Sequence, residues 1–428
     1  VVTVSRLGDD LSEVPRRIDW DAWLAPHRGA APAFERFGFD HPGFVLYSSG
    51  TTGPPKCIVH RAAGILLTHL REHRFHCDVR PGDRVFYFTT CGWMMWNWLV
   101  SSLAIGATVI AYDGSPFHPG PSRLFDIADE HAATLLGVSA KFLDSCRKEG
   151  LRPVDTHHLA SVRTICSTGS PLHVEGFRYV YDAVAHDVHL ASISGGTDLC
   201  GCFVAGDPTR PVHAGEIQGP ALGMLVDVFD EHGQPCGVGV DGELVCRPDF
   251  PTIPLGFWGD TDGSRLHAAY FERFDDWWAH GDYAAWTEHG GIVIHGRSDA
   301  TLNAGGVRIG TAEIYRIVEQ LDAVAECIAV GQQWEGDTRI VLFVRTAPGH
   351  ELDDALRDEI KRRLRASASP RHVPARIAAV DDIPRTRSGK ISELAVADVV
   401  NHRPLRNTEA LANPEALEHY RDRAELTV

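Results

Sequence analysis

The sequence predicts an α/β protein with a large N-terminal domain, which is α/β at first and then β-rich, and a smaller C-terminal α+β domain. Three observations support this prediction. Short apolar runs alternate with amphipathic segments of helical length after Phe44, closely spaced strand patterns with Gly, Pro and Asp turns follow Ser192, and a second mixed pattern begins beyond Asp299. The first alternation is typical of βα units around a largely parallel sheet.

The elements of the large domain are expected in the following order. The first residues hold few periodic apolar positions and are interrupted by prolines at 15, 26, 32 and 42, so this part of the domain looks incomplete. Strands are then predicted at 44–47, 84–88, 107–111, 134–138 and 162–166, with helices at 62–76 and 122–131. The β-rich part is predicted from strands at 225–230, 242–246 and 292–294.

The C-terminal domain is predicted from a mixture of helices and strands. Helices are expected at 311–321 and 352–366 and strands at 325–330, 340–344 and 376–380, with a short helix at 414–426. The predicted boundaries are therefore 1–298 for the large domain, incomplete at its N-terminus, and 299–428 for the C-terminal domain. The second domain has a normal size.

Composition excludes several classes of function. The chain has 57 acidic and 41 basic residues and a formal net charge of −16, which argues against general binding of nucleic acid. No apolar stretch reaches the ~20 residues that a membrane-spanning helix needs. The ten cysteines never form a C-x-x-C pattern, and a chain of this length does not need disulfides, so a reducing cytoplasm is expected.

A run rich in hydroxyls and glycines is the strongest local signal. Residues 47–56 read YSSGTTGPPK, which leaves a predicted strand and ends at Lys56. Such a loop can direct backbone N–H groups, hydroxyls and one ammonium toward a polyphosphate. It is not a Walker A loop, because Pro55 and Cys57 stand where that motif needs Gly and then Ser or Thr.

Further motifs follow this loop in a constant order, and together they resemble the AMP-forming acyl-adenylate family. This family includes acyl-CoA synthetases, firefly-type luciferases and the adenylation domains of peptide synthetases. The resemblance extends from Phe44 to Lys390, and the order of the motifs supplies the context that one pattern lacks. The motifs are TGSP at 168–171, SGGTD at 194–198, HGDY at 280–283, GRSD at 296–299, GVRIGTAEI at 306–314 and PRTRSGKI at 384–391.

The resemblance implies ATP, Mg²⁺ and coenzyme A as cofactors and assigns the nucleotide-binding residues. Asp198, beside Thr197, is expected to hold Mg²⁺, Asp282 to accept from the ribose hydroxyls, and Arg297 to reach the ribose or a phosphate. A carboxylate that accepts from two vicinal hydroxyls is a chemically reasonable ribose clamp. The remaining nucleotide-binding residues would be Ser49, Gly50, Thr51, Thr52, Gly53 and Lys56 at the phosphates, Gly169, Ser170 and Pro171 at the adenine, and Gly196.

The resemblance also assigns catalysis to Lys390, Asp198 and Thr51. Attack of a carboxylate on the α-phosphate brings two anions together, so a cation such as Lys390 at the bridging oxygen stabilises the transition state. Lys390 lies in the C-terminal domain and the phosphate loop in the large one, so the C-terminal domain is expected to be mobile, with Asp299 as the hinge. After rotation, the loop at Gly305, Gly306 and Arg308 would admit the thiol of coenzyme A.

The expected acid is short. Residues 92–93 and 256–260 resemble the acetyl-CoA synthetase branch, and acetate-specific relatives have Trp where this chain has Gly195, so a longer acid fits. Acetoacetate is the preferred candidate, with a propionyl- or butyryl-type synthetase as the alternative. Trp93 is a candidate for the pocket wall, although a packed aromatic cluster is an equally good explanation.

A non-catalytic fragment of such an enzyme is the alternative of a different class, because few residues precede Phe44 where the family carries a sizeable subdomain. The small-molecule partners are the acid, ATP and coenzyme A. The resemblance also predicts that a lysine acyltransferase and a deacylase act on Lys390, whose charge acylation would remove.

Three other patterns have simpler explanations. His69-Leu70-Arg71-Glu72-His73, with His76 nearby, matches an inverted zinc-protease motif, but we expect a solvated helix face. Residues 237–242 spell G-x-G-x-x-G before a strand, which predicts a hairpin turn and not a dinucleotide site. The basic helix at 352–366 is expected to be a solvated surface, with attraction of the 3′-phosphate of coenzyme A as the alternative.

Overall fold

The computed structural model describes residues 1–4, 10–48, 56–304, 307–335, 337–386, 389–405 and 408–427. The chain forms two compact units, residues 1–38 and residues 39–428. Within the described residues, none of the helices combines the length and the apolar character needed to cross a bilayer.

The first unit contains two short strands and one short helix. β1 (Val2–Thr3) pairs in parallel with β2 (Ile18–Asp19), and α1 (Trp20–Leu24) follows directly. The Asp19 carboxylate accepts from two backbone N–H groups of the first turn of α1, which is the usual way to satisfy the free donors of a helix start.

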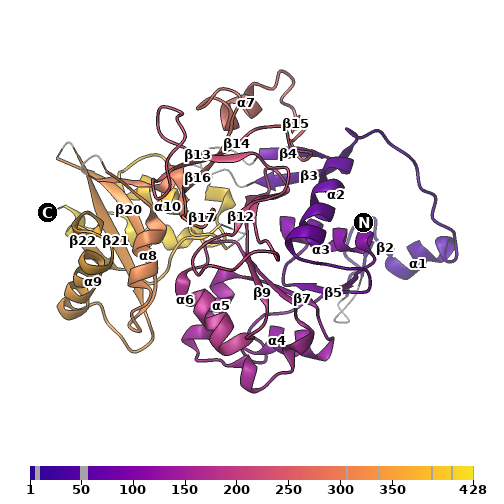
Figure 1. Ribbon diagram of the computed structural model, residues 1–428, viewed down its shortest axis with the longest axis horizontal. Coiled ribbons are helices and arrows are strands. Elements are labelled where there is room, and N and C mark those ends of the chain that lie inside the picture. Colours follow the sequence, from indigo (N-terminus) through magenta and orange to yellow (C-terminus); the bar gives the residue numbers. More distant parts are fainter. Residues whose placement is uncertain are drawn as a thin grey trace. The chain divides into compact units, whose positions relative to one another are not determined.

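A five-stranded parallel sheet organises the first part of the second unit (Figure 1). Its strands lie in the order β6, β5, β7, β8, β9, and every neighbouring pair is parallel. Four of them coincide within a few residues with predicted runs, so the predicted sheet is confirmed. The strands are β5 (Arg84–Tyr87), β6 (Thr108–Ile110), β7 (Leu135–Ser139), β8 (Thr164–Thr168) and β9 (His189–Ser192).

Helices cover both faces of this sheet, which explains why most residues of its strands are buried. One core packs the sheet against α4 (Arg123–Glu130), α5 (Ala140–Lys148) and α6 (Val174–Tyr179). The opposite face packs against α3 (Met94–Ser101), and α2 (Ala62–Arg71) with the π-helical turn after it lies beside α3.

The predicted strand at 44–47 belongs to a different sheet. β3 (Pro42–Ser48) pairs antiparallel with β4 (Lys56–Arg61), and β4 pairs antiparallel with β15 (Gly256–Phe257). The expectation that this strand opens the parallel βα pattern was therefore wrong. An apolar run identifies a strand, but only tertiary pairing decides which strand lies beside it.

Antiparallel sheets form the β-rich part. The larger has the order β13, β14, β16, β17, and the smaller has the order β10, β11, β12. The glycine run at 237–242 lies in the connection between the antiparallel strands β13 and β14, as the turn prediction required. The elements here are β10 (Ser194–Gly196), β11 (Gly201–Ala205), β12 (Gly219–Pro220), β13 (Val226–Phe229), β14 (Gly242–Cys246), α7 (Ser264–Tyr270), β16 (Trp278–Trp286) and β17 (Ile292–Arg297).

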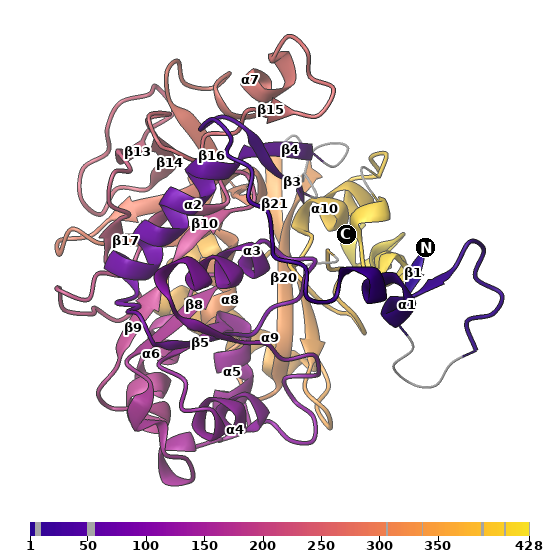
Figure 2. The same ribbon diagram turned by 90° about the vertical axis from the view of Figure 1, so that its right-hand side faces the viewer.

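Residues beyond 300 fold around a second sheet, in the order β20, β21, β22, whose long strands are visible in Figure 2. β21 is antiparallel to β20 and parallel to β22. The helices predicted at 311–321 and 352–366 and the three predicted strands of this region are present. The elements are β18 (Leu302–Ala304), β19 (Val307–Ile309), α8 (Thr311–Val318), β20 (Val324–Trp334), β21 (Asp337–Thr346), α9 (Asp354–Ser367), β22 (Arg376–Ala379) and α10 (Glu393–Val400).

Two cores lie on opposite faces of this sheet. One joins it to α8 and α9, and the other joins it to α10 and to the 3₁₀ turn Pro414–Tyr420 in place of the predicted helix at 414–426. These cores draw their members from residues 302–426, whereas the preceding cores draw theirs from residues 58–292. This division supports the predicted boundary at 298/299, which remains a prediction.

Candidate active site

Three side chains from distant parts of the second unit meet at one point. Lys56 begins β4, Asp198 lies in the turn between β10 and β11, and Tyr270 ends α7. Lys56 Nζ lies 3.4 Å from Asp198 Oδ1 and 3.2 Å from the Tyr270 hydroxyl, which itself donates a hydrogen bond to Oδ1. The structure thus brings together two residues that the sequence predicted for the site and adds a third that it did not.

The Asp198 carboxylate is charged although only 14% of the side chain is exposed. Burial by itself raises its pKa, but His280, Lys56 and the Tyr270 hydrogen bond outweigh that effect and lower the pKa to about 2. Burial also lowers the pKa of His280 below its ordinary value. At neutral pH the site therefore presents a carboxylate that is held by an ammonium and a phenol.

The turn that carries Asp198 is held by three buried side chains, from β4, from α2 and from the π-helical turn that follows α2. The imidazole Nε2–H of His60 donates to the Thr197 carbonyl over 2.9 Å, and Nε2–H of His69 donates to the Cys200 carbonyl over 2.8 Å. Glu72 Oε1 accepts from the Cys202 backbone N–H over 2.8 Å. We name His60, His69 and Glu72 the turn-holding residues. Three contacts along six residues leave the backbone around Asp198 little freedom.

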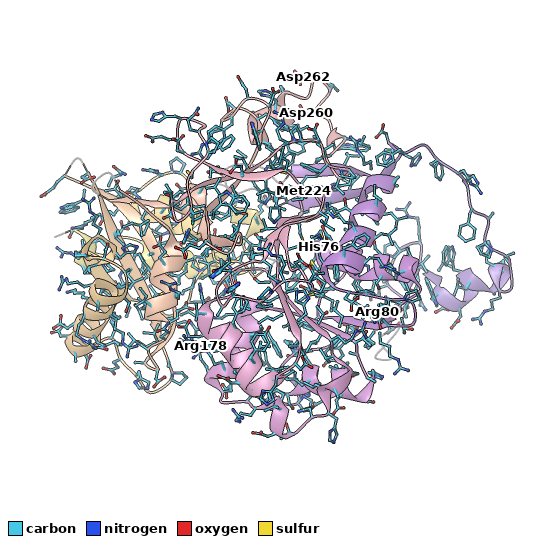
Figure 3. The ribbon with its side chains drawn as sticks, in the orientation of Figure 1. His76, Arg80, Arg178, Met224, Asp260 and Asp262 are labelled. Atoms are coloured by element: carbon cyan, nitrogen blue, oxygen red, sulfur yellow. The ribbon has the colours of Figure 1, made fainter. Side chains whose placement is uncertain are left out.

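The prediction of a solvated helix face at 69–73 was wrong, because His69, Glu72 and His73 are buried and Arg71 is partly buried. His69 and His73 are fully buried and Glu72 is 1% exposed. His73 Nε2–H donates to the Trp98 carbonyl over 2.8 Å, and the Trp98 indole N–H donates to Glu72 Oε2 over 2.9 Å. The nearby His76, labelled in Figure 3, donates to the Gly206 carbonyl over 2.6 Å.

The physical reason is that this helix lies between α3 and β11, whose backbone groups need side-chain partners once they are buried. Burial lowers the pKa of His69 and of His73 to about 4, so both are neutral at pH 7. Across the described residues there is no group of three or more His, Cys, Asp or Glu side chains arranged to hold a metal ion.

Asp282 and Arg297 lie side by side on neighbouring strands. They are directly opposed in the β16–β17 pairing, and Arg297 Nη1 lies 3.3 Å from Asp282 Oδ1 and donates to the His280 carbonyl over 3.0 Å. Gly281, which directly precedes Asp282, has φ +86°. A Cβ at this glycine would lie 2.4 Å from Arg297 Nη2. Only glycine permits this approach of the guanidinium.

A buried carboxylate fixes the backbone around this pair. Glu243 Oε1 accepts from the Gly281 N–H over 2.9 Å and from the Ser298 hydroxyl over 3.1 Å, while Oε2 pairs with Arg273. Burial raises the pKa of Glu243. Glu243 therefore holds both Gly281, which precedes Asp282, and Ser298, which precedes the predicted hinge residue Asp299.

The predicted adenine motif leaves the carboxyl end of the parallel sheet. Thr168 ends β8, and its hydroxyl donates to the Ile193 carbonyl over 3.1 Å. Gly169 follows with φ +94°, and then come Ser170 and Pro171. The Ser194–Gly196 strand starts next to this point, so the two motifs meet at the edge where open α/β sheets usually bind ligands.

The two residues predicted for the acid pocket are placed differently. Trp93 is half-buried directly before α3. A Cβ on Gly195 would lie 2.0 Å from the Gly201 carbonyl oxygen and 2.7 Å from Cys202 Cα. The backbone of β11 thus fills the space that an indole would need. Close packing against β11 therefore explains glycine at position 195 without reference to the size of the acid. The role of Gly195 in the acid pocket stays a prediction. At Gly196 a Cβ would lie 2.8 Å from the His280 ring.

Lys390 is exposed on a turn of the C-terminal region. Thr386 N–H donates to the Lys390 carbonyl over 2.8 Å, and Arg385 Nη1 donates to the Gly389 carbonyl over 2.9 Å. Arg385 also pairs with Glu326 at 2.5 Å. Among the described contacts, none joins the Lys390 ammonium to Asp198 or Asp282, so the predicted catalytic cation is not assembled with the nucleotide-binding residues.

Several predicted residues lie outside the described residues. They are Ser49, Gly50, Thr51, Thr52 and Gly53 of the phosphate loop and Gly305 and Gly306 of the later glycine motif. Asp299 lies in a 3₁₀ turn, and Arg308 lies on β19. Of these two residues, only the backbone is described. Their predicted roles remain predictions.

Sequence reasoning missed Tyr270, His60, His69, Glu72 and Glu243. Tyr270 is 72 positions from Asp198, and Glu72 is 130 positions from Cys202. No spacing rule joins residues so far apart. The one available signal was the cluster of histidines and an acid on a single helix face, and a solvated surface explains such a cluster equally well.

Comparison with known proteins identifies the family. The family described as "AMP-binding enzyme" matches residues 5–253, and the family described as "AMP-binding enzyme C-terminal domain" matches residues 313–390. The chain belongs to the AMP-binding enzyme family. The resemblance and the α/β fold class that the sequence predicted are thereby confirmed.

Named relatives narrow the similarity further. The chain is 61% identical over 404 residues to acetoacetyl-coenzyme A synthetase of Rhizobium meliloti (strain 1021), covering 94% of this chain and 62% of that protein. It is 46% identical over 422 residues to acetoacetyl-CoA synthetase of Mus musculus, covering 97% and 63%. The solved acetoacetyl-CoA synthetase from Streptomyces lividans superimposes with a TM-score of 0.90 at 44% identity, covering 98% and 64%. The chain thus spans less than two thirds of the length of these relatives.

Proposed function

We propose that this AMP-binding enzyme joins acetoacetate to coenzyme A in two steps that consume one ATP. A carboxylate oxygen of acetoacetate attacks the α-phosphorus of ATP, which forms acetoacetyl-AMP and releases pyrophosphate. The thiol of coenzyme A then attacks the acyl carbonyl, loses its proton, and AMP leaves. The observation that carries the proposal is the 61% identity, over 94% of the chain, to an acetoacetyl-coenzyme A synthetase.

Local groups must attract ATP, because the chain as a whole carries a net charge of −16. Among the described residues, the Lys56 ammonium has hydrogen-bond partners in Asp198 and Tyr270, and it can exchange these partners for phosphate oxygens. Asp282 can accept from both ribose hydroxyls. Arg297, which is 40% exposed beside it, can donate to the ribose or the α-phosphate.

The donor set at Asp198 fits Mg²⁺. Proteins hold this ion through one or two carboxylates together with the phosphates of the substrate. Asp198 supplies one ionised carboxylate, and Thr197 lies beside it. When bound, Mg²⁺ would offset the negative charge of the phosphates. The turn-holding residues keep the Asp198 backbone in place for that role.

We propose that Lys390 reaches the α-phosphate after a rotation of the C-terminal domain about Asp299. In the arrangement described above Lys390 is exposed, and its turn is attached to β20 through Arg385 and Glu326. A second orientation would bring Gly305, Gly306 and Arg308 to the adenylate for thioester formation. Separate geometries for the two steps suit an enzyme that binds a second substrate only after the first reaction.

A second candidate is a non-catalytic fragment of such an enzyme. The chain covers 62–64% of the length of the relatives, but its identity to acetoacetyl-CoA synthetases does not favour this alternative. A short-chain acyl-CoA synthetase for propionate or butyrate is the alternative acid specificity, and the names of the relatives disfavour it.

The test is exchange of labelled pyrophosphate into ATP with acetate, propionate, butyrate and acetoacetate. The proposal predicts the highest kcat/KM with acetoacetate, and thioester formation once coenzyme A is added. A better rate with butyrate would contradict the proposed acid. A folded chain that exchanges pyrophosphate with none of the four acids would favour the fragment.

Two further proposals concern the cellular setting. We propose a cytoplasmic location, which is supported by the presence of all ten cysteines as free thiols. We also propose that Lys390 is acylated by an acyltransferase and restored by a deacylase, which its exposure allows. Unchanged pyrophosphate exchange by quantitatively acylated protein would contradict the second proposal.

A further inference from the structure

Tyr270 is held in place independently of the groups that its hydroxyl contacts. Its side chain is buried, and its ring stacks on Trp278 with 3.6 Å between ring centroids and 13° between the planes. Trp278 is itself fully buried, with Phe250 and Phe271 packed against it edge to face. The phenol is therefore fixed by a rigid aromatic core.

The direction of each hydrogen bond at the hydroxyl follows from chemistry. A lysine ammonium has no acceptor, so Lys56 donates to the Tyr270 oxygen at 3.2 Å. The single phenol proton is then left for Asp198 Oδ1, to which Tyr270 donates. Lys56 Nζ also lies 4.4 Å from the centroid of the Tyr270 ring, within cation–π range.

One oxygen of Asp198 is thus occupied, and among the described contacts no hydrogen bond reaches the other. Oδ1 accepts from both Lys56 and Tyr270. Oδ2 lies 3.4 Å from the place where a Cβ on Gly196 would stand. Tyr270 therefore determines which of the two carboxylate oxygens is left for another ligand.

We propose that Tyr270 is a positioning residue that orients Asp198 toward the magnesium–triphosphate end of ATP, an inference that rests on the proposed function. When phosphate oxygens draw Lys56 away, the phenol keeps its hydrogen bond to Oδ1, so Oδ2 keeps its orientation and stays available to another ligand. Without the hydroxyl, Lys56 is the one described donor left on Oδ1. Phosphate must then compete with an undivided ion pair, and Asp198 loses its orientation.

The test is Tyr270→Phe, which keeps the stack on Trp278 and the ring below Lys56 and removes only the hydroxyl. We expect KM for ATP and the Mg²⁺ concentration for half-maximal pyrophosphate exchange to rise about tenfold, as for loss of one charge-assisted hydrogen bond. We expect kcat and KM for the acid to change less than about threefold. The matched control is Tyr179→Phe, whose hydroxyl donates to the Leu151 carbonyl over 2.9 Å, and it should change none of these values.

Calorimetric binding supplies a readout besides activity. Tyr270→Phe should bind MgATP about tenfold more weakly than the wild type and should bind AMP without metal equally well, because AMP lacks the β- and γ-phosphates. In an Asp198→Asn background, Tyr270→Phe should add no further loss of MgATP affinity. Equal weakening of AMP and MgATP, or full additivity with Asp198→Asn, would overturn the proposal.

The two proposals can fail separately. If the wild-type chain binds MgATP in a way that depends on Tyr270 but activates no acid, the proposed reaction fails and the role of Tyr270 stands. If acetoacetate is activated and Tyr270→Phe matches the wild type, the role of Tyr270 fails alone.

Discussion

The Asp198 turn and the Lys390 turn carry the two charges that the proposed chemistry needs, and they are built in opposite ways. The Asp198 turn is held by the three turn-holding residues, which come from β4, α2 and the π-helical turn after α2 and are all buried. Its carboxylate is further fixed by Lys56 and Tyr270. The charge is therefore in place before any substrate arrives, and no reorganisation is needed to use it.

The Lys390 turn is exposed and attached through ion pairs. Arg385 joins it to Glu326 of β20, and Glu326 also pairs with Lys141 of α5 at 2.7 Å. Lys141 is 45% exposed, so this attachment is partly screened by water. The difference teaches that the nucleotide-binding charge is preorganised, whereas the proposed catalytic charge stands on an exposed turn that, in the proposed mechanism, a domain rotation delivers.

The largest expected effect tests the buried side of this comparison. Glu72→Leu removes the acceptor of the Cys202 N–H and the Trp98 N–H and leaves the Arg71 guanidinium without its carboxylate partner. Breaking a buried ion pair in this way costs about 3–5 kcal/mol, which urea unfolding will measure. Glu359→Leu on α9, a carboxylate that pairs with Arg362 at the surface, is the control and should leave the midpoint unchanged. Similar loss in both variants would contradict the difference between the two regions.

The Lys390 turn is tested by the variant Lys390→Ala. Loss of a cation that acts on the developing charge should slow adenylate formation on the order of 10²–10³-fold. Thioester formation from supplied acyl-AMP should be nearly unchanged, and so should the urea midpoint, because the side chain is exposed. Lys361→Ala on α9 is the matched control. Equal loss in both half-reactions would contradict a role confined to the first step.

A smaller effect is expected from pH. His69 and His73 have pKa values of about 4 in the folded chain and an ordinary value of 6.5. Between pH 6.5 and 4 the unfolded chain binds more protons, so stability is full above pH 6.5 and falls as pH decreases toward 4. At pH 5 each histidine should account for about 2 kcal/mol of lost stability. The free energy of urea unfolding of His69→Gln should depend less on pH than that of the wild type. An unchanged dependence would contradict the lowered pKa of His69.

The smallest effect is expected at Glu326, the residue to which the Lys390 turn is attached. Lys141→Ala removes one of the cations that face Glu326, while Arg345 and Arg385 remain at 3.0 and 2.5 Å. The expected loss of stability is below about 1 kcal/mol. A loss as large as that of Glu72→Leu would show that the Lys390 turn is as rigidly held as the Asp198 turn.

The predictable part of the fold and site was the part encoded by neighbouring residues. Lys56, Asp198 and Asp282 each stand in a contiguous motif, and apolar runs marked the parallel strands because those strands are buried on both faces. By contrast, the antiparallel pairing of β3 with β4 depends on tertiary contacts that no run of residues describes.

The turn-holding residues and Tyr270 could not be found for the same reason. A buried His or Glu on an amphipathic helix has the same sequence pattern as a solvated one, and only the approach of β11 distinguishes them. Gly195 shows the limit in the other direction. The absence of a side chain at Gly195 suggested room for a larger acid. In the structure, the backbone of Gly201 lies so close to Gly195 that a side chain would not fit.

A crystal structure of the chain with bound AMP tests the central claim most directly. The account predicts that both ribose hydroxyls donate to Asp282, that the phosphate lies toward Arg297 and Lys56, and that the turn-holding residues keep their present contacts. AMP bound away from Asp282 and Lys56, or an Asp198 turn that refolds on binding, would contradict it.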